Sequence, residues 1–443
     1  MGSPTEKHER RPDPGLAFVA YRALTSLVRP AAGLILRVRE RRGKEDATRL
    51  GERLGHPAVR RPEGTLVWFH AASVGETNAV LPLIAALLEA RPALSALLTT
   101  GTVTSARLAA TRLPRGAIHQ YVPLDASEFV RRFLDHWRPR LAVFTEQEIW
   151  PNLVFESHAK LIPLALVNAR MSQSSFERWQ RRRGLARPLF SRFDVVLAQS
   201  EKLASQFSEL GASRSLVAGN LKIDAPALPI NAPERQRLEA ALAGRPRLVA
   251  ASTHDGEEAV IAAAHRLIAR SLDGFVTVLA PRHPERGPAI AEMLKSQGFN
   301  VAQRSLGALP DASTDIYIAD TIGELGTLYA ITPIAFVGGS LVAKGGQNPI
   351  EPIRHGVAVL TGPHRLNFAD AYDVLLAHNA VSEVASAEEL AARVLLLSSD
   401  PGELDSVQAR AAEALRSMSG ALGRTLEVLL ALLPADEGLK RAS

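Results

Sequence analysis

The chain has 443 residues, of which 46% are hydrophobic and 22% are charged, so it is long enough for two globular domains. It contains no cysteine and only 5% aromatic residues, which excludes disulfide bonds, thiolate metal centres and a cysteine nucleophile, and argues against the stacking surfaces that bind single-stranded nucleic acid. Residues 1–61 hold 14 Lys/Arg against 7 Asp/Glu and account for the net charge of +6, so the basic end predicts an anionic partner, membrane or polyanion, whereas the nearly neutral remainder predicts no nucleic-acid partner.

Residues 1–14 are polar and contain proline, which predicts a disordered terminus. Residues 15–44 carry apolar side chains at helical spacing between Leu16 and Ile35, with arginines on another face and an interruption at Pro30. Such a run is too broken to span a bilayer and predicts an amphipathic helix lying on a membrane, followed by a basic stretch. The alternative is an ordinary helix packed on the body of the protein.

From Thr65 onward, short apolar runs rich in β-branched residues alternate with helical stretches, which predicts parallel sheets covered on both faces. The Pro-rich segment 225–234 reads as a linker, so we expect one Rossmann-like domain over 45–224 and a second over 235–443, facing a cleft. The expected strands are Leu66–Phe69, Ala96–Thr99, Ala117–Val122, Leu141–Phe144, Ile162–Val167, Val195–Ala198, Arg247–Ala251, Phe275–Ala280, Asp315–Ala319, Ile334–Val337 and Ala358–Leu360.

Polar residues follow several of these strands, where open α/β sheets bind ligands. Glu76 follows the first strand at the start of a helix, so it is either a general base or a carboxylate that favours a helix N-terminus. Glu146 and Glu148 form an acidic pair that is either a metal site or plain surface charge. No Asp-x-Asp occurs in the chain, which weakens a metal-dependent mechanism, and no metal or cofactor is expected.

The second half contains candidate phosphate ligands. Arg282 lies between prolines at a strand end, and Asn348 stands between a Gly-rich loop and an expected helix start, with Glu351 close by. Each has a plainer interpretation, as a solvated turn or as helix capping. The arginine-rich stretch 178–187 can either hold acceptor phosphates or form a solvated helix face.

Nine short motifs occur between residues 65 and 370: SVGE (73–76), EQEIWPN (146–152), NARMS (168–172), GNLKID (219–224), STHDGEE (252–258), PRHPER (281–286), DTIGEL (320–325), FVGGSLVAKGGQNPIEP (336–352) and GPHRLNF (362–368). In order and spacing they resemble the 3-deoxy-D-manno-octulosonic acid (Kdo) transferases of lipopolysaccharide and lipid A biosynthesis. The resemblance implies a GT-B glycosyltransferase that moves Kdo from CMP-Kdo to the lipid A precursor (lipid IVA), inverting and metal-independent, at the cytoplasmic side of the cell inner membrane.

The resemblance also implies roles for single residues. It makes Glu76 the general base, and Glu146 and Lys222 the groups that stabilise the transition state. Gln147 and Gln347 depart from the family pattern, which has threonine and histidine there. The residues that match the CMP site are Pro281, Arg282, Gly323, Glu324, Leu325, Asn348, Pro349, Ile350 and Glu351.

Two other functions fit parts of the sequence. A non-hydrolysing nucleotide-sugar epimerase has the same two-domain architecture, but it needs no lipid acceptor and so leaves the basic amphipathic N-terminus unexplained. A polyanion-binding protein fits the basic end, but the nearly neutral body argues against it.

Overall fold

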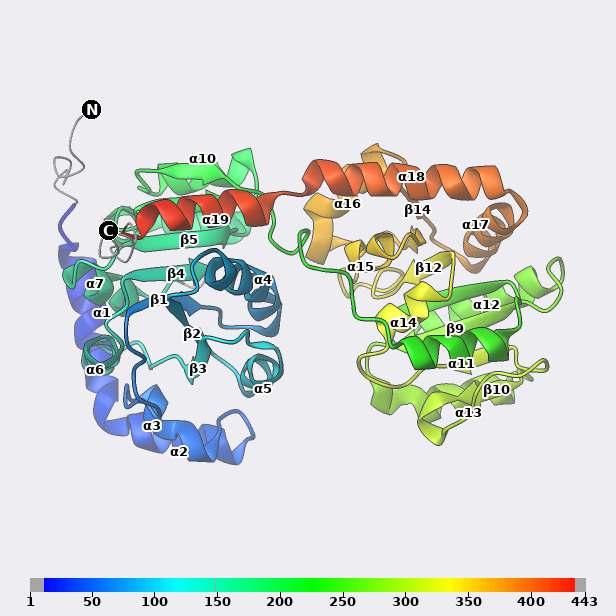
Figure 1. The fold of residues 1–443 in the computed structure, drawn as a ribbon, viewed down its shortest axis with the longest axis horizontal. Coiled ribbons are helices and arrows are strands. Elements are labelled where there is room, and N and C mark those ends of the chain that lie inside the picture. The colour runs from blue at the N-terminus through cyan, green and yellow to red at the C-terminus, as the bar shows by residue number, and fades with distance from the viewer. Residues whose placement is uncertain (1–11, 148, 435–443) are drawn as a thin grey trace, which may run out of the picture. The chain divides into compact units, whose positions relative to one another are not determined.

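The computed structural model describes residues 12–147 and 149–434, which form two compact α/β units (Figure 1). The first unit comprises residues 1–225 and 419–443, and the second comprises 226–418. Within the described residues each unit contains a seven-stranded sheet in which all neighbouring strands are parallel. The sequence prediction of an α/β fold with two Rossmann-like domains is confirmed.

The first sheet has the strand order β3-β2-β1-β4-β5-β6-β7. Side chains alternate between its two faces, so that Trp68 lies in one apolar core while Val67 and Phe69 lie in the other. Its strands are β1 Thr65–His70, β2 Leu94–Thr100, β3 Ala117–Tyr121, β4 Leu141–Thr145, β5 Leu164–Ala169, β6 Val195–Ala198 and β7 Ser215–Val217. The helices of this unit are α1 Gly15–Val28, α2 Ala32–Arg41, α3 Leu50–Arg53, α4 Val74–Ala90, α5 Val103–Arg112, α6 Ser127–Trp137, α7 Pro151–Ala159, α8 Gln173–Arg181, α9 Arg183–Phe190, α10 Glu201–Glu209 and α19 Ala421–Leu432.

The second sheet has the order β10-β11-β9-β8-β12-β13-β14 and is likewise buried on both faces. Its strands are β8 Arg247–Thr253, β9 Val276–Pro281, β10 Val301–Gln303, β11 Ile316–Ile318, β12 Ile334–Val337, β13 Ala358–Thr361 and β14 Val381–Glu383. The helices of this unit are α11 Ala232–Leu242, α12 Glu257–Ala269, α13 Gly287–Ser296, α14 Leu325–Ala330, α15 Ile350–Arg354, α16 Ala369–Ala377, α17 Ala387–Ser399 and α18 Pro401–Met418.

The C-terminal boundary differs from the expected domain 235–443, because the chain returns to the first unit after α18. Helix α19 packs on α4 and buries Ala421 and Leu429 in the first unit's core. The Asp224 carboxylate accepts hydrogen bonds from the backbone N–H groups of Gly420 and Leu422, at 2.9 and 2.6 Å, and so holds the start of α19. The expected linker 225–234 also ends earlier than predicted, since α11 begins at Ala232.

Helix α1 packs on the body through one face and exposes an apolar face. Phe18 stacks on Phe155 with ring centroids 3.7 Å apart, and the Tyr21 hydroxyl donates to Asp125 at 2.7 Å. On the outward side Leu16 and Leu27 are 88% and 76% exposed. The helix is therefore packed on the body and amphipathic at once. Residues 1–11 of the predicted disordered terminus lie outside the described residues.

The predicted helical region 15–44 is divided where the sequence placed the interruption. Helix α1 ends at Val28, a single 3₁₀ turn follows over Arg29–Ala31, and α2 begins at Ala32. Proline lacks a backbone N–H, so Pro30 favours this break. Within 12–147 and 149–434, no helix combines the length and apolarity needed to cross a bilayer.

The contact between α1 and Asp125 predicts a pH dependence of stability. Burial raises the pKa of Asp125 from 3.8 to about 6, outweighing the hydrogen bonds that the carboxylate accepts. The folded group then binds its proton more tightly than the unfolded one, so its stabilising contribution is full below pH 4 and is lost as the pH rises through 6. A difference of this size corresponds to roughly 2–3 kcal/mol.

We therefore expect the free energy of unfolding of the first unit to fall more between pH 4 and pH 7 in the wild type than in Asp125→Asn. Urea unfolding followed by tryptophan fluorescence measures this unit selectively, because Trp68, Trp137, Trp150 and Trp179 are the chain's four tryptophans and all lie in it. Identical pH dependence in the two proteins would contradict the assignment.

Candidate active site

The first unit gathers polar side chains at the carboxyl end of its sheet. Segments 71–76, 146–147 and 170–172 follow β1, β4 and β5, and segment 218–224 follows β7. Ligands of open parallel sheets bind at this edge, because the loops after the strands meet there. The sequence prediction that polar residues cluster at strand ends is confirmed for this unit, and the contacts below show how they are held.

Glu76 is tied to the start of α4. Its backbone N–H donates to Ser73 Oγ at 3.3 Å, the Ser73 hydroxyl donates back to Glu76 Oε1 at 2.6 Å, and the Ala72 N–H donates to Oε2 at 2.9 Å. This reciprocal pattern is a variant of the capping box in which the carboxylate accepts from the Ser73 hydroxyl and the Ala72 N–H, so the helix-capping alternative is realised. Each oxygen of an ionised carboxylate accepts two hydrogen bonds, so capping is compatible with a second role as a base.

Glu146 and Lys222 form an ion pair that joins two of these loops. Lys222 Nζ lies 2.6 Å from Glu146 Oε1, and Arg170 Nη1 lies 4.0 Å from Oε2. Glu146 is only 8% exposed, so these cations compensate the loss of hydration of its carboxylate. A Cβ built on Gly75 would lie 3.9 Å from Lys222 Nζ, which places the ammonium group beside the start of α4.

Asn168, in β5, connects the loop after β4 to the loop after β7. Its Nδ2 donates to Glu146 Oε1 at 3.3 Å, and its Oδ1 accepts from the Leu221 N–H at 3.0 Å. Both Glu146 and Asn168 have left-handed backbone conformations, with φ of 56° and 51°. Such strain in non-glycine residues is characteristic of functional sites, where the surrounding structure fixes it. The structure thus pairs two of the three predicted catalytic residues, Glu146 and Lys222, and sets Lys222 beside the start of α4, the helix that carries the third, Glu76.

Of the acidic pair proposed from the sequence, Glu146 is described above and Glu148 lies outside the described residues. Among the residues that the structure describes, no group of three or more His, Asp or Glu side chains is arranged to hold a metal ion.

In the second unit, the predicted donor-binding residues also follow strands. Pro281 ends β9, and the N–H of the exposed Arg282 donates to the carbonyl of Thr253 in β8 at 2.9 Å. Asn348 Oδ1 accepts from the Ile350 N–H at 3.0 Å, and Asn348 Nδ2 donates to Glu351 Oε1 at 3.2 Å. Burial raises the pKa of Glu351, opposed by that hydrogen bond and by the positive charge of Arg282.

These contacts place Arg282 within electrostatic range of the segment that opens α15, where Pro349 and Ile350 are buried. Gln347, which stands where the family pattern has histidine, places its Nε2 3.2 Å from His254 Nε2. The expected helix after Asn348 is present, but it is only five residues long.

The third predicted donor segment lies at the start of α14, which packs on α15. Gly323 has a φ of 90°, and Leu325 is the first residue of the helix. Glu324 pairs with Arg304 at 2.7 Å, and Arg304 also contacts Glu234 at 2.6 Å. Glu324 is thus engaged in an ion-pair network, which fixes this loop and leaves the backbone around Gly323 at the surface.

Sequence reasoning missed Glu257, the fully buried first residue of α12. Its carboxylate accepts four backbone hydrogen bonds, from His254, Gly339, Ser340 and Leu341, at 2.7 to 2.9 Å. It therefore fastens the loop after β12 to the loop after β8. The neighbouring Gly338 allows this approach, because a Cβ there would lie 2.6 Å from the carbonyl oxygen of Ser252. Glu257 lies in the family motif at 252–258, but the motif by itself did not indicate what this residue does.

Two parallel α/β units of this kind, each with polar loops at the carboxyl end of its sheet, are the architecture of the GT-B fold. Solved structures with the same fold include a putative UDP-N-acetylglucosamine 2-epimerase from Listeria monocytogenes (14% identical, TM-score 0.57, 83% of this chain and 96% of that one) and a glycosyltransferase from Rickettsia africae (11% identical, TM-score 0.56, 84% and 99%). At these identities the likeness concerns the fold alone.

The chain belongs to the 3-deoxy-D-manno-octulosonic acid transferase family. The family described as 3-deoxy-D-manno-octulosonic-acid transferase (kdotransferase) matches residues 48–225. A probable mitochondrial 3-deoxy-D-manno-octulosonic acid transferase of Arabidopsis thaliana is 37% identical over 93% of this chain and 95% of its own length. The 3-deoxy-D-manno-octulosonic acid transferase of Haemophilus influenzae is 34% identical over 86% and 90%. The expected family is thereby confirmed, and the epimerase alternative is not favoured.

The Glu257 contacts predict a strongly destabilised second unit in Glu257→Gln. The amide would turn an NH₂ group toward backbone N–H donors, which costs about 2–3 kcal/mol. We expect circular dichroism to show earlier thermal unfolding and hydrogen exchange to show lost protection of the amides of residues 339–341. Glu285→Gln, at a carboxylate that is 75% exposed, is the matched control and should unfold like the wild type. Retained protection in Glu257→Gln would show that these hydrogen bonds do not hold the loop.

Proposed function

We propose that this protein transfers Kdo from CMP-Kdo to the lipid A precursor lipid IVA, with inversion and without a metal ion, at the cytoplasmic face of the inner membrane. Family membership supports the sugar and the reaction class. The observation that supports the assignment of residues is the Glu146–Lys222 ion pair at the carboxyl end of the first sheet, beside the start of the helix that carries Glu76.

In the proposed reaction the acceptor hydroxyl oxygen attacks the anomeric carbon of Kdo. The new carbon–oxygen bond forms as the bond to the cytidylate phosphate breaks, and CMP leaves with that electron pair. Glu76 takes the hydroxyl proton. Its two hydrogen bonds from Ser73 and Ala72 hold the carboxylate still, so the base is oriented before the acceptor arrives.

Lys222 has a proposed electrostatic role that depends on Glu146. The ammonium group has three N–H donors, of which the Glu146 contact uses one. The others can bind the carboxylate that Kdo carries at its anomeric carbon. Because Glu146 is itself held by Asn168, the ammonium group is positioned in advance, which is the condition for effective electrostatic stabilisation.

On the donor side, the exposed guanidinium group of Arg282 is proposed to bind the cytidylate phosphate, and Asn348 and Glu351 the nucleoside. Arginine pairs with phosphate through charge-assisted hydrogen bonds. A cytidylate leaving group stabilised in this way does not require a divalent cation. The expected transfer should therefore persist in EDTA.

The exposed face of α1 supports the proposed membrane location. Leu16, Leu24 and Leu27 point away from the body and are 88%, 62% and 76% exposed. Arg41 and Arg42, also exposed, follow at the end of α2. An apolar face flanked by basic residues is typical of helices that lie in the interface of an anionic bilayer.

The decisive experiment incubates the purified protein with CMP-Kdo and lipid IVA in EDTA and identifies the product by mass spectrometry. In this assay Glu76→Gln should lower kcat by about 10²–10⁴-fold, because glutamine cannot accept the proton. Glutamine also serves in capping boxes, so the fold should be kept. The affinity for CMP should be unchanged, since the donor residues belong to the second unit.

Ser73→Ala is the control for the capping role of Glu76. It removes the cap but leaves the carboxylate, so it should cost about 1 kcal/mol of stability and far less activity than Glu76→Gln. If Glu76→Gln retained near-normal turnover, another group would be the base. If it lost stability as Ser73→Ala does and activity only in proportion, Glu76 would be a capping residue alone.

The membrane proposal is tested by replacing Leu16, Leu24 and Leu27 together with glutamine. Deleting α1 is less informative, because it would also uncover Phe155 and Asp125. Burial of one leucine is worth about 1.5–3 kcal/mol, so flotation with phosphatidylglycerol vesicles should fall by at least ~100-fold in partition coefficient. Replacing the equally exposed Leu306 and Leu366 with glutamine is the control and should leave flotation intact. Equal flotation of the α1 variant and the wild type would refute the proposal.

A further inference from the structure

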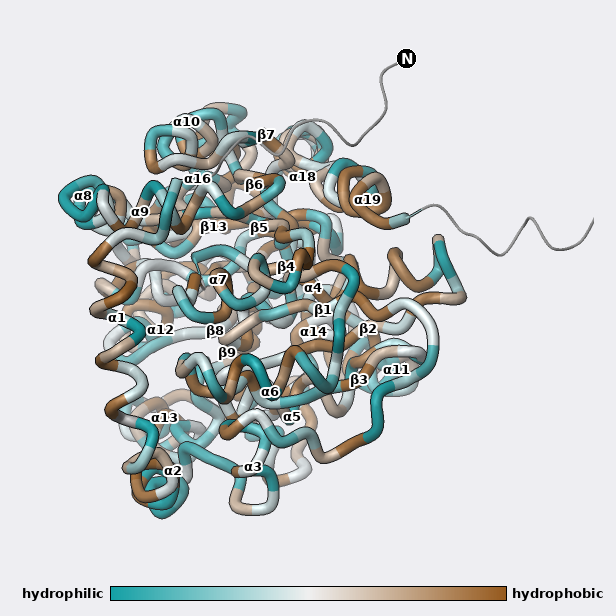
Figure 2. The backbone as a smooth tube through the Cα atoms, turned by 90° about the vertical axis from the view of Figure 1, so that its left-hand side faces the viewer, coloured by the Kyte–Doolittle hydropathy of each residue, from teal (hydrophilic) through white to brown (hydrophobic). Residues whose placement is uncertain are grey.

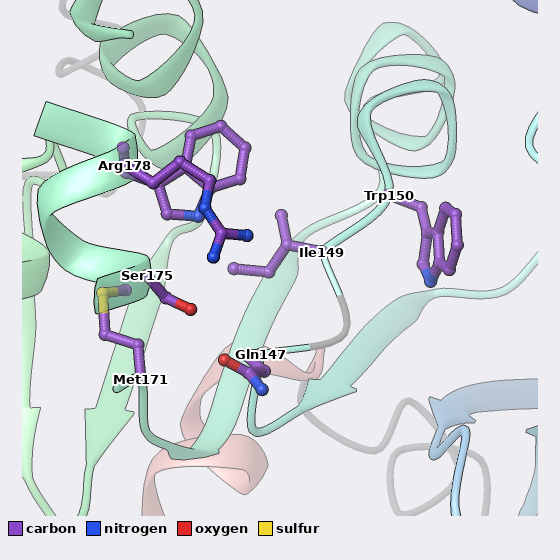
Figure 3. A pocket seen from close by; sticks show the side chains of 7 residues that line it. Gln147, Ile149, Trp150, Met171, Ser175 and Arg178 are labelled. Atoms are coloured by element: carbon purple, nitrogen blue, oxygen red, sulfur yellow. The ribbon is translucent and has the colours of Figure 1, made fainter. Parts of the chain in front are cut away.

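A pocket of about 300 Å³ in the first unit lies beside the Glu146 loop (Figure 3). This volume is at the lower end of the range for small-molecule sites, which is about 300–1,000 Å³. Two of its lining residues extend the active cluster directly: Gln147 follows Glu146, and Met171 follows Arg170. The lining residues are Gln147, Ile149, Trp150, Met171, Ser175, Arg178 and Trp179.

The pocket combines a cation with an apolar wall. Figure 3 shows Arg178 and Ile149 pointing toward one another, with the side chains of Gln147 and Ser175 below them and Trp150 directed away. Ile149 and Trp179 are partly buried against the core, and Met171 is 8% exposed. Such a lining suits a ligand that is anionic at one point and apolar at the next.

Arg178 is the residue available for the anion. Among the described residues it has no carboxylate within ion-pair distance, in contrast to Arg131 and Arg132, which pair with Glu156 and Glu128. Arg181, Arg182, Arg183 and Arg187 follow it in the chain, so the local field favours a phosphate over a cation. Gln147 and Ser175 add hydrogen-bonding groups at the same opening.

The pocket is also connected to the exposed face of α1. Helix α8, which carries Ser175, Arg178 and Trp179, packs on α9, and α9 packs on α1. Figure 2 shows α1, α8 and α9 along one edge of this unit. Helix α9 thus links the helix that lines the pocket to the helix proposed to lie on the membrane.

We propose that this pocket binds the acceptor lipid at a phosphate-bearing end, with Arg178, Gln147 and Ser175 on the phosphate and Ile149, Met171 and Trp179 on the first methylenes of an acyl chain. The proposal rests on the proposed function, because it assigns a subsite for the same acceptor. It makes Arg178 a specificity residue for phosphate and Ile149 one for acyl chains.

The test compares Arg178→Gln with Arg181→Gln, a matched control on the same helix that does not line the pocket. The acceptors are lipid IVA with both phosphates and the two derivatives that each lack one phosphate. Loss of a charge-assisted hydrogen bond should raise the KM for lipid IVA about 10- to 100-fold in Arg178→Gln and leave the KM for CMP-Kdo unchanged. With the derivative that lacks the phosphate bound by Arg178, Arg178→Gln and the wild type should have equal KM, because that contact is missing in both. Arg181→Gln should resemble the wild type throughout.

The acyl side is tested with Ile149→Ser, which should raise the KM for lipid IVA but not for its deacylated form. Direct binding, measured from the fluorescence change as acceptor is titrated, separates this proposal from the proposed function, since Trp179 lines the pocket. If the wild type binds lipid IVA in an Arg178-dependent manner without turnover, the subsite stands and the proposed function fails. If the wild type turns over and Arg178→Gln weakens all acceptors equally, or no more than Arg181→Gln, the subsite is refuted. If neither the wild type nor Arg178→Gln binds lipid IVA, the subsite is also refuted.

Discussion

The ion pair between Lys222 and Glu146 is the contact on which the first unit's site depends. A carboxylate that is 8% exposed needs partners for its charge, and it has them from two segments: Lys222 follows β7, and Asn168 and Arg170 lie at the end of β5 and just after it. The same contact holds Lys222 beside the start of α4, where the Glu76 carboxylate accepts a hydrogen bond from the N-cap residue Ser73. Left-handed backbone at Glu146 and Asn168 is the strain that this network sustains.

The second unit also contains a buried carboxylate, but that carboxylate is held by different groups. Its buried carboxylate, Glu257, is compensated by four backbone N–H groups rather than by a cation. The result is a rigid connection between the loops after β8 and β12, with no positive charge consumed. Arg282 is exposed. The next residue of α12, Glu258, is also buried but pairs with Arg286, so this helix start uses backbone N–H groups for one carboxylate and a cation for the other.

Helix α1 packs on the body of the first unit and also exposes large apolar side chains. Its inward face uses an aromatic stack and the Tyr21–Asp125 hydrogen bond, and Asn152, at the start of α7, donates to Thr25 at 3.1 Å. The leucines on the outward face are thereby left exposed. Because α7 begins just after the Glu146 loop, the helix proposed to meet the membrane is joined by hydrogen bonds to the element that follows the site. This arrangement is consistent with the proposed lipid acceptor.

The sequence alone determined the α/β class, the two-unit organisation and the family, because apolar periodicity and motif order are local properties. It missed β7, β10 and β14, three-residue edge strands that are too short to carry an alternating pattern and exist only because a neighbouring strand pairs with them. The return of α19 to the first unit likewise depends on Asp224 and on the α4 surface, which lie far away in sequence. Glu76, Glu146 and Lys222 were identifiable as motif residues. Only the tertiary structure decided that Glu146 and Lys222 form an ion pair and that Glu257 holds the loop after β12. The partners of these buried charges are distant in the sequence, so local patterns do not reveal them.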